Sequence, residues 1–285
     1  MEGIAAAFKT HLARLGYSPG SQSMLPACVA EFLQYTQRPP AQIRAADITR
    51  YHAYLQQRPN RRRSGGLSEQ MIYHQLYALR LLFIYWEQTG LVTASPMSGL
   101  SFSQPRHGPR AILSSDEIQQ LFNSAQSLRV KAMLHLCYSC GLRRKEAVQL
   151  NIRDIHFRNC LLYVRSGKGA KRRVIPLPEK VSHDLKLYYL HERPELASAV
   201  RPTEAFLLHS QGGRISGNTL NELFKRLLDQ TGLEKAMSLH SLRHSIATHL
   251  LANGLALEQV RDFLGHAHLE STQLYTHIDI KQLLL

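Results

Sequence analysis

The segment Ser101 to Arg110, SFSQPRHGPR, constrains the fold most, because it separates two halves with different hydrophobic patterns. It contains two prolines, one glycine and two arginines, and its apolar residues follow no helical period. Such a composition is typical of an exposed connection. A chain of 285 residues is also long for a single core. We therefore expect two domains, residues 1–100 and 111–285, joined by a linker at residues 101–110.

The first half has the pattern of a helical bundle. Its apolar residues recur at spacings of three and four from Phe8 to about Gly99. Proline and glycine interrupt the pattern at residues 18–20, 38–40 and 58–66. The last interruption, RPNRRRSGG, carries Arg61, Arg62 and Arg63. It is either a solvated loop or a loop that contacts phosphates.

The second half mixes helices with short strands. Ser114, with acidic residues two and three positions later, predicts a helix start, and another helix is expected through Val130 to Cys140. Two strand-like runs, residues 161–165 and 173–177, flank a glycine-rich turn with Lys168 at its tip. The period is helical again from Glu179. We expect a mainly α fold with a small β-sheet (α+β): an N-terminal helical bundle and a C-terminal mixed domain.

The net charge of +14 points to an anionic partner. Nucleic acid fits best, because each phosphate neutralised by Lys or Arg releases condensed counterions, although an acidic membrane surface would also attract such a chain. The N-terminus lacks the pattern of a signal peptide and no run of about 18 apolar residues occurs, so a cytoplasmic, nucleoid-associated protein is expected. Cys137 and Cys140 form a lone C-x-x-C pair, which favours buried thiols over a metal site.

Five local signals in the second half suggest chemistry on phosphate. In chain order they are Arg143 after a glycine, the turn lysine Lys168, His240 with Arg243 three residues later, His266 after a glycine, and Tyr275 near the C-terminus. Each signal alone has an ordinary structural explanation, such as a surface ion pair, a turn or a core tyrosine. Together they supply the groups needed to displace an alkoxide from a phosphodiester without a metal.

The series GLR…E, GKG.K.R..PL, H.LRH, LGH and TQ.YTH resembles the tyrosine recombinases of the phage integrase family, most closely their compact Xer-type branch. The resemblance covers Leu113 to His277. It implies a catalytic domain of that fold and a DNA core-binding domain in the helical half. It also implies a site-specific recombinase that needs no cofactor and no metal, with catalytic residues Arg143, Lys168, His240, Arg243, His266 and Tyr275.

The resemblance also implies the role of each group. Arg143 and Arg243 would hold the two non-bridging phosphate oxygens, and His266 would be a further phosphate-binding or orienting group. Lys168 would protonate the departing 5′ oxygen. His240 would help to remove the proton of Tyr275, whose phenol must be activated because its ordinary pKa is near 10. The product would be a 3′-phosphotyrosyl intermediate.

Other residues have supporting roles in this interpretation. Glu146 matches an acidic position that would orient its neighbours. Candidate DNA contacts are Arg61, Arg62, Arg63, Arg106, Arg110, Arg144, Lys145, Lys171 and Arg172. Arg144 and Lys145 stand where many relatives have uncharged residues, so they are either phosphate contacts or part of a solvated face. Further histidines could suggest a metal site, but no H-E-x-x-H pattern occurs.

The expected partner is double-stranded DNA with a specific recombination site, bound by a homotetramer on two sites or together with a partner recombinase. Leu283, Leu284 and Leu285 would dock into a neighbouring protomer or pack on their own domain. The alternatives, all ranked below recombination, are type IB topoisomerase-like relaxation, a non-cutting DNA-binding regulator and a metal-dependent nuclease. The biological job stays open between Xer-like resolution and mobile-element integration or excision, and the unusual RPNRRRSGG loop favours the mobile element slightly.

Overall fold

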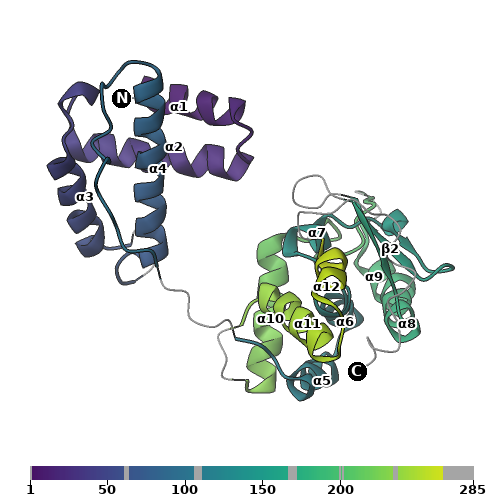
Figure 1. Ribbon diagram of the computed structural model, residues 1–285. Helices are drawn as coiled ribbons and strands as arrows, with labels where there is room; N and C mark the ends of the chain where they lie inside the picture. Colours follow the sequence, from purple (N-terminus) through teal and green to yellow (C-terminus); the bar gives the residue numbers. More distant parts are fainter. Residues whose placement is uncertain are drawn as a thin grey trace. The chain divides into compact units, whose positions relative to one another are not determined.

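The computed structural model describes residues 2–60, 64–105, 111–165, 172–198, 200, 202–233 and 237–265. The chain divides into two compact units, Met1–Gly108 and Pro109–Leu285 (Figure 1). Each unit has its own hydrophobic core. No helix in the described ranges is both long and apolar enough to cross a bilayer.

The first unit is built mainly from helices. Its elements are α1 (Glu2–Arg14), α2 (Pro19–Thr36), the 3-10 turn η1 (Pro40–Gln42), α3 (Ala45–Gln57) and α4 (Glu69–Gln88). The helix starts follow from local chemistry. The Ser18 and Ser68 hydroxyls accept hydrogen bonds from backbone N–H groups of the first turns of α2 and α4. Pro19 needs no partner at the first position of α2, where the N–H has no acceptor in the helix.

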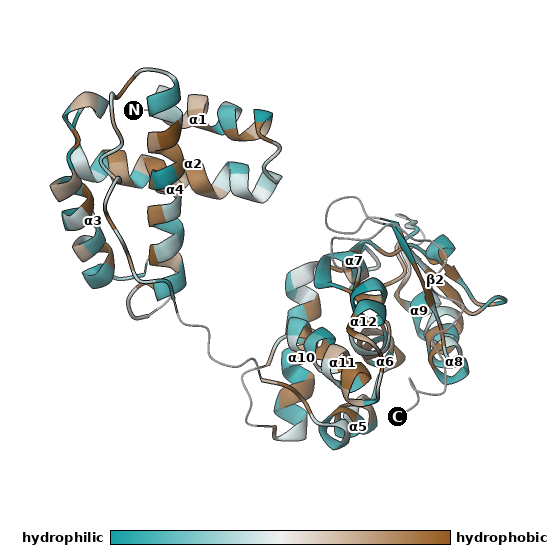
Figure 2. Cartoon of the chain, viewed as in Figure 1, coloured by the Kyte–Doolittle hydropathy of each residue, from teal (hydrophilic) through white to brown (hydrophobic). Residues whose placement is uncertain are grey.

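Aromatic side chains fill the core of the first unit. Phe32, Tyr51, Phe83 and Trp86 are fully buried, and the apolar faces of the helices turn inward (Figure 2). Phe32 meets Tyr51 edge-on at 5.0 Å between ring centroids, and Phe83 meets Trp86 at 5.2 Å. The helical period read from the sequence is the period of this buried face, so the expected bundle is confirmed.

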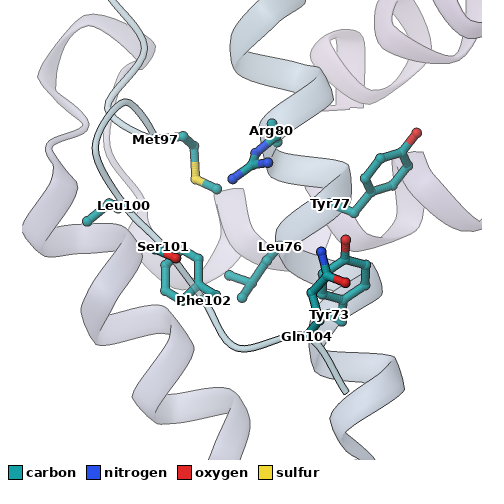
Figure 3. A pocket seen from close by; sticks show the side chains of 9 residues that line it. All are labelled: Tyr73, Leu76, Tyr77, Arg80, Met97, Leu100, Ser101, Phe102 and Gln104. Atoms are coloured by element: carbon teal, nitrogen blue, oxygen red, sulfur yellow. The ribbon is translucent and has the colours of Figure 1, made fainter. Parts of the chain in front are cut away.

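Part of the segment expected to be linker packs on the first unit. The ring of Phe102 lies 4.9 Å from that of His52, measured between centroids. Residues 97–104 and α4 enclose a cavity of about 180 Å³, lined among others by Leu76, Arg80 and Met97 (Figure 3). Among the described residues that line this cavity, Arg80 is the one with a charged side chain, and Tyr73 and Tyr77 lie in the same wall.

The second unit combines helices with a small sheet. In chain order its elements are α5 (Ser115–Ser124), α6 (Leu128–Leu134), the π-helical turn η2 (His135–Ser139), α7 (Arg144–Gln149), the 3-10 turn η3 (Ile152–Asp154), β1 (Ile155–His156), β2 (Leu161–Val164), β3 (Arg173–Pro176), α8 (Glu179–Leu187), the π-helical turn η4 (Tyr188–Glu192), α9 (Arg193–Leu196), α10 (Gly217–Thr231), α11 (Leu239–Ala252) and α12 (Leu257–Leu264). The strands form one antiparallel sheet in the order β1-β2-β3. The α+β prediction is confirmed.

The register of the sheet follows its burial pattern. Leu162 on β2 stands opposite Ile155 on β1 and Ile175 on β3, and all three side chains are buried. The predicted helix start at Ser114 is also confirmed: its hydroxyl accepts from the Glu117 N–H, and the Glu117 carboxylate accepts from the Ser114 N–H.

The helix from α6 into η2 is among the most buried segments of the second unit. His135 is 4% exposed, and its ring nitrogens are 2.9 Å from Asp184 Oδ2 and 3.1 Å from Ser139 Oγ. Burial raises the pKa of the Cys137 and Cys140 thiols to about 12. Both thiols therefore stay protonated at neutral pH, as the interpretation of buried structural thiols predicts.

Candidate active site

Two arginines a hundred residues apart in the sequence reach the same place. Arg143 is the N-cap residue of α7, and Arg243 lies in the second turn of α11. Arg243 is 3% exposed and donates to the carbonyl oxygens of Gly141 and Leu264. Arg143 donates to the next carbonyl, that of Gly265, at 3.1 Å. The two guanidinium groups therefore meet at the C-terminal end of α12.

Two glycines permit this close approach. Gly141 and Gly265 both have positive φ, at 56° and 64°. A Cβ on Gly141 would lie 2.8 Å from Leu264 Cδ2, and one on Gly265 would lie 3.0 Å from Arg173 Nη1. Side chains at these two positions would push the end of α12 away from the arginines.

We expect Gly141→Ala to lower both stability and activity. The left-handed backbone costs a non-glycine residue about 1–2 kcal/mol, and the collision with Leu264 adds to it. Gly232→Ala is the matched control, because Gly232 also has positive φ, 67°, but its added Cβ would meet nothing within 4 Å. Thermal unfolding should show a larger fall in the midpoint temperature for Gly141→Ala than for Gly232→Ala. Equal falls for the two variants would contradict close packing of Gly141 against Leu264.

A buried carboxylate ties the cluster together. The Glu146 side chain is 3% exposed. It accepts hydrogen bonds from the backbone N–H of Arg143 at 2.9 Å and from Arg143 Nη1 at 2.8 Å. Arg173, the first residue of β3, donates to both Glu146 oxygens, at 3.2 and 2.9 Å. Two guanidinium groups bond to this one carboxylate and a third, that of Arg243, is close enough to feel their charges, so the cluster carries an excess of positive charge suited to a phosphate.

The cluster shifts the pKa values of its members. Burial raises the pKa of Glu146, but the hydrogen bonds and charge of Arg173, and then those of Arg143, outweigh it and leave the pKa below its ordinary value. Burial, followed by the charges of Arg143 and Arg173, lowers the pKa of Arg243 to about 9. Arg243 therefore remains charged at neutral pH, and so does Glu146.

The shift at Glu146 makes stability depend on pH. Because its pKa is lower in the folded protein, its contribution is complete well above the ordinary value of 4.5 and is lost as the pH falls through the folded pKa. Glu146→Gln should cost about 3 kcal/mol at pH 7, since it breaks a buried ion pair. Urea unfolding should show that the difference in free energy of unfolding between parent and variant becomes smaller from pH 6 to pH 3.5. A difference that stays constant with pH would contradict an ionised Glu146.

The other predicted residues are partly within the described chain. His240 lies exposed in the first turn of α11, three residues before Arg243. Arg144, Lys145 and Arg172 are also exposed. Arg144 crosses the start of α10, where a Cβ on Gly217 would lie 3.2 Å from its Nε. The following predicted residues lie outside the described ranges: Arg61, Arg62, Arg63, Arg106, Arg110, Lys168, Lys171, His266, Tyr275 and the three C-terminal leucines.

Sequence reasoning missed Arg173 as a site residue. It is the arginine of the pattern GKG.K.R..PL and the first residue of the predicted strand 173–177, but no role in the site was predicted for it. Only the fold shows that Arg173 is 7% exposed and faces a carboxylate 27 positions earlier.

A second ion pair lies at the other end of the β2–β3 connection. Arg165 follows β2, and its Nε lies 2.5 Å from Oδ1 of Asp154, whose side chain is 6% exposed. A cavity of about 170 Å³ extends between this pair and Glu146, with Leu142 and Tyr163 also in its wall. Arg165 precedes the segment that contains Lys168 and Arg173 follows it, and each is held by a buried carboxylate.

The basic loop of the first unit is anchored in a similar way. Arg58, at the end of α3, pairs with Glu31 at 2.7 Å between Nη2 and Oε1. Gln75 of α4 donates to the other Glu31 oxygen at 2.9 Å. Pro59 and Gly66 then pair as a short antiparallel bridge. The Arg58 flank of the segment that contains Arg61 to Arg63 is therefore fixed to the helical bundle, and the bridge joins the two flanks to each other.

Comparison with known proteins shows which family has this sequence. Residues 111–282 match the phage integrase family. Tyrosine recombinase XerC 2 of Ralstonia nicotianae is 34% identical over 252 residues, which are 86% of this chain and 71% of the relative. Tyrosine recombinase XerD of Listeria monocytogenes is 30% identical over 244 residues, 84% of this chain and 80% of the relative.

Solved structures agree with the sequence relatives. The crystal structure of XerA recombinase aligns with 99% of this chain and 96% of its own, at 26% identity and a TM-score of 0.51. A lambda integrase dimer bound to a core site aligns with 96% and 99% at a TM-score of 0.74. Its 15% identity makes this second likeness one of fold.

Proposed function

The chain belongs to the phage integrase family and is a tyrosine-type site-specific DNA recombinase, and from this premise we propose that Tyr275 is its nucleophile. The phenol oxygen of Tyr275 attacks the scissile phosphorus, and the bond from phosphorus to the 5′ oxygen breaks. A 3′-phosphotyrosyl bond forms, and the departing 5′ oxygen takes a proton from Lys168. A free 5′-hydroxyl of another strand then reverses the step and completes strand exchange.

The meeting of Arg143 and Arg243 at the end of α12 is the observation that carries this proposal. Both groups are held by backbone carbonyls before any substrate arrives, so little reorganisation is needed when charge develops on the phosphate. His266 follows Gly265 directly in the sequence, and Gly265 accepts the Arg143 hydrogen bond. The proposed phosphate site is thus Arg143, Arg243 and His266.

In this proposal His240 helps to remove the proton of the Tyr275 phenol. Its place in the exposed first turn of α11, one turn before buried Arg243, would let it meet DNA while Arg243 stays fixed. Glu146 transfers no proton in this scheme. It holds Arg143 in place, because it accepts from both the backbone and the side chain of that residue.

The recombinase acts on DNA, and we extend the proposal to the residues that bind the DNA. The first unit is the core-binding domain, and the loop fixed by the Glu31–Arg58 pair presents Arg61, Arg62 and Arg63 to phosphates. Exposed Arg144, Lys145 and Arg172 add contacts on the catalytic unit, together with Arg106, Arg110 and Lys171. The target is a specific recombination site, bound by a tetramer on two duplexes or with a partner recombinase. The integration or excision of a mobile element is the preferred role.

The test is covalent capture in the absence of metal. Purified protein is incubated in EDTA with labelled duplexes from the ends and junctions flanking its own gene, each nicked near the candidate site so that cleavage cannot reverse. An SDS-resistant protein–DNA adduct is expected. Salt-sensitive binding without any adduct would contradict the cutting mechanism.

Plasmids carrying two copies of the captured site then separate the activities. Recombinant products are expected from a strand-exchanging tetramer. Relaxed plasmid with no recombinants would instead indicate activity of the type IB topoisomerase kind. Recombination that appears only when a second recombinase is added would establish the need for a partner.

A further inference from the structure

Arg173 is an arginine that the proposed mechanism does not use. It begins β3 and is 7% exposed. Its two terminal nitrogens take both oxygens of Glu146, at 3.2 and 2.9 Å. Two parallel hydrogen bonds from a planar fork fix the plane of a carboxylate as well as its position. Arg173 therefore determines where the Glu146 oxygens point.

The same two oxygens hold Arg143. Oε1 accepts from Arg143 Nη1 at 2.8 Å, and Oε2 accepts from the Arg143 backbone N–H at 2.9 Å. Each Glu146 oxygen is thus shared between Arg173 and Arg143. A rotation of the carboxylate would move the bonds to both, so the orientation of Arg143 depends on Arg173.

Arg173 also lies against the last turn of α12. A Cβ added to Gly265 would come within 3.0 Å of Arg173 Nη1, and the Gly265 carbonyl accepts from Arg143. Arg173 thus bonds to one of the groups that hold the Arg143 guanidinium, the Glu146 carboxylate, and lies beside the other, Gly265. Lysine cannot replace it, because an ammonium is a point charge without the fork.

We propose that Arg173 is a positioning residue that places Arg143 on the scissile phosphate through the buried carboxylate of Glu146. This inference rests on the proposed function. Its alternatives are that Arg173 only stabilises the fold, or that it acts on the leaving group through the nearby segment that contains Lys168. Substrate analogues distinguish all three.

The test compares Arg173→Lys with the parent in single-turnover cleavage of the captured site. The change keeps the charge and removes the fork, and we expect cleavage to slow by about 10²-fold, as small misplacements of a catalytic group do. DNA affinity should change less than about threefold. Arg193→Lys is the control for folding, because Arg193 is an equally buried arginine of the same unit whose fork binds the carbonyls of Thr203 and Ala205. It should cleave at nearly the parent rate.

Two modified phosphates identify the step. A methylphosphonate at the scissile position removes the negative charge that Arg143 neutralises, so it should remove most of the gap in cleavage rate between Arg173→Lys and the parent. A 5′-bridging sulfur makes a leaving group that needs no proton, and it should leave the gap unchanged. Rescue by sulfur but not by the methylphosphonate would overturn the proposal in favour of the leaving group.

A purely structural role has its own signature. A gap that neither analogue narrows, with a thermal midpoint far below that of Arg193→Lys, would overturn the proposal. Glu146→Asp provides a second route, because it shortens the same link from the other side and should give the same pattern of rescue. Cleavage of unmodified DNA by the parent tests the proposed function, whereas the ratio of variant to parent rates tests Arg173, so the two failures are distinguishable.

Discussion

Tyr275→Phe is expected to abolish covalent joining to DNA, with cleavage reduced by about 10⁴-fold or more. Phenylalanine keeps the ring and removes the oxygen that would bond to phosphorus. DNA affinity should stay within about threefold of the parent, because binding depends on basic groups rather than on the nucleophile. SDS gel analysis of labelled, nicked substrate measures the adduct, and a gel shift measures binding.

Tyr189→Phe is the matched control for this substitution. Tyr189 is a half-buried tyrosine of η4 in the same unit, with its ring 5.7 Å from that of Phe157. It should form the adduct at the parent rate. An adduct from Tyr275→Phe, with none from Tyr189→Phe, would mean that the nucleophile has been misassigned.

Arg243→Lys is expected to slow cleavage by about 10³-fold, comparable to the loss of a strong transition-state donor. A lysine ammonium cannot donate to the carbonyls of Gly141 and Leu264 and still offer a planar face to phosphate. Burial and the neighbouring guanidinium groups lower the pKa of Arg243 to about 9. Because the ordinary pKa of lysine starts about two units lower than that of arginine, the same surroundings would weaken its charge near neutral pH.

Single-turnover cleavage at pH 7 and pH 6 tests this second prediction. The lysine variant should recover part of its activity at the lower pH, where the ammonium is more fully charged, while the parent changes less. A variant within tenfold of the parent at pH 7 would contradict the assigned role of Arg243. Thermal unfolding of both proteins shows whether lost packing contributes.

Much of the fold could be predicted from short-range patterns in the sequence. The Ser114 cap and the two runs that became β2 and β3 could be predicted because they depend on neighbours in the sequence. The helical bundle could be predicted because its buried face repeats every three to four residues. The strand β1 was missed, since two residues are too short to show an alternating pattern.

The site was predictable only in part, for a physical reason. Arg143, Glu146 and Arg243 were found because each stands in a recognisable motif, and the fold brings them together. Arg173 was missed as a member of the cluster because its burial depends on Glu146, which lies on a different element. The Glu31–Arg58 pair was missed for the same reason, since it joins α2 to the end of α3. Pairing between distant elements leaves no local pattern.

The most direct test of the central claim is to locate the covalent bond. The adduct formed in EDTA is digested with nuclease and trypsin, and mass spectrometry searches for a peptide that carries a nucleotide. Cleavage after Arg261 and Lys281 releases a peptide in which Tyr275 is the one tyrosine. The mechanism predicts a phosphate-linked nucleotide on Tyr275. A nucleotide on any other residue, or an adduct that forms only when a divalent metal is supplied, would contradict it.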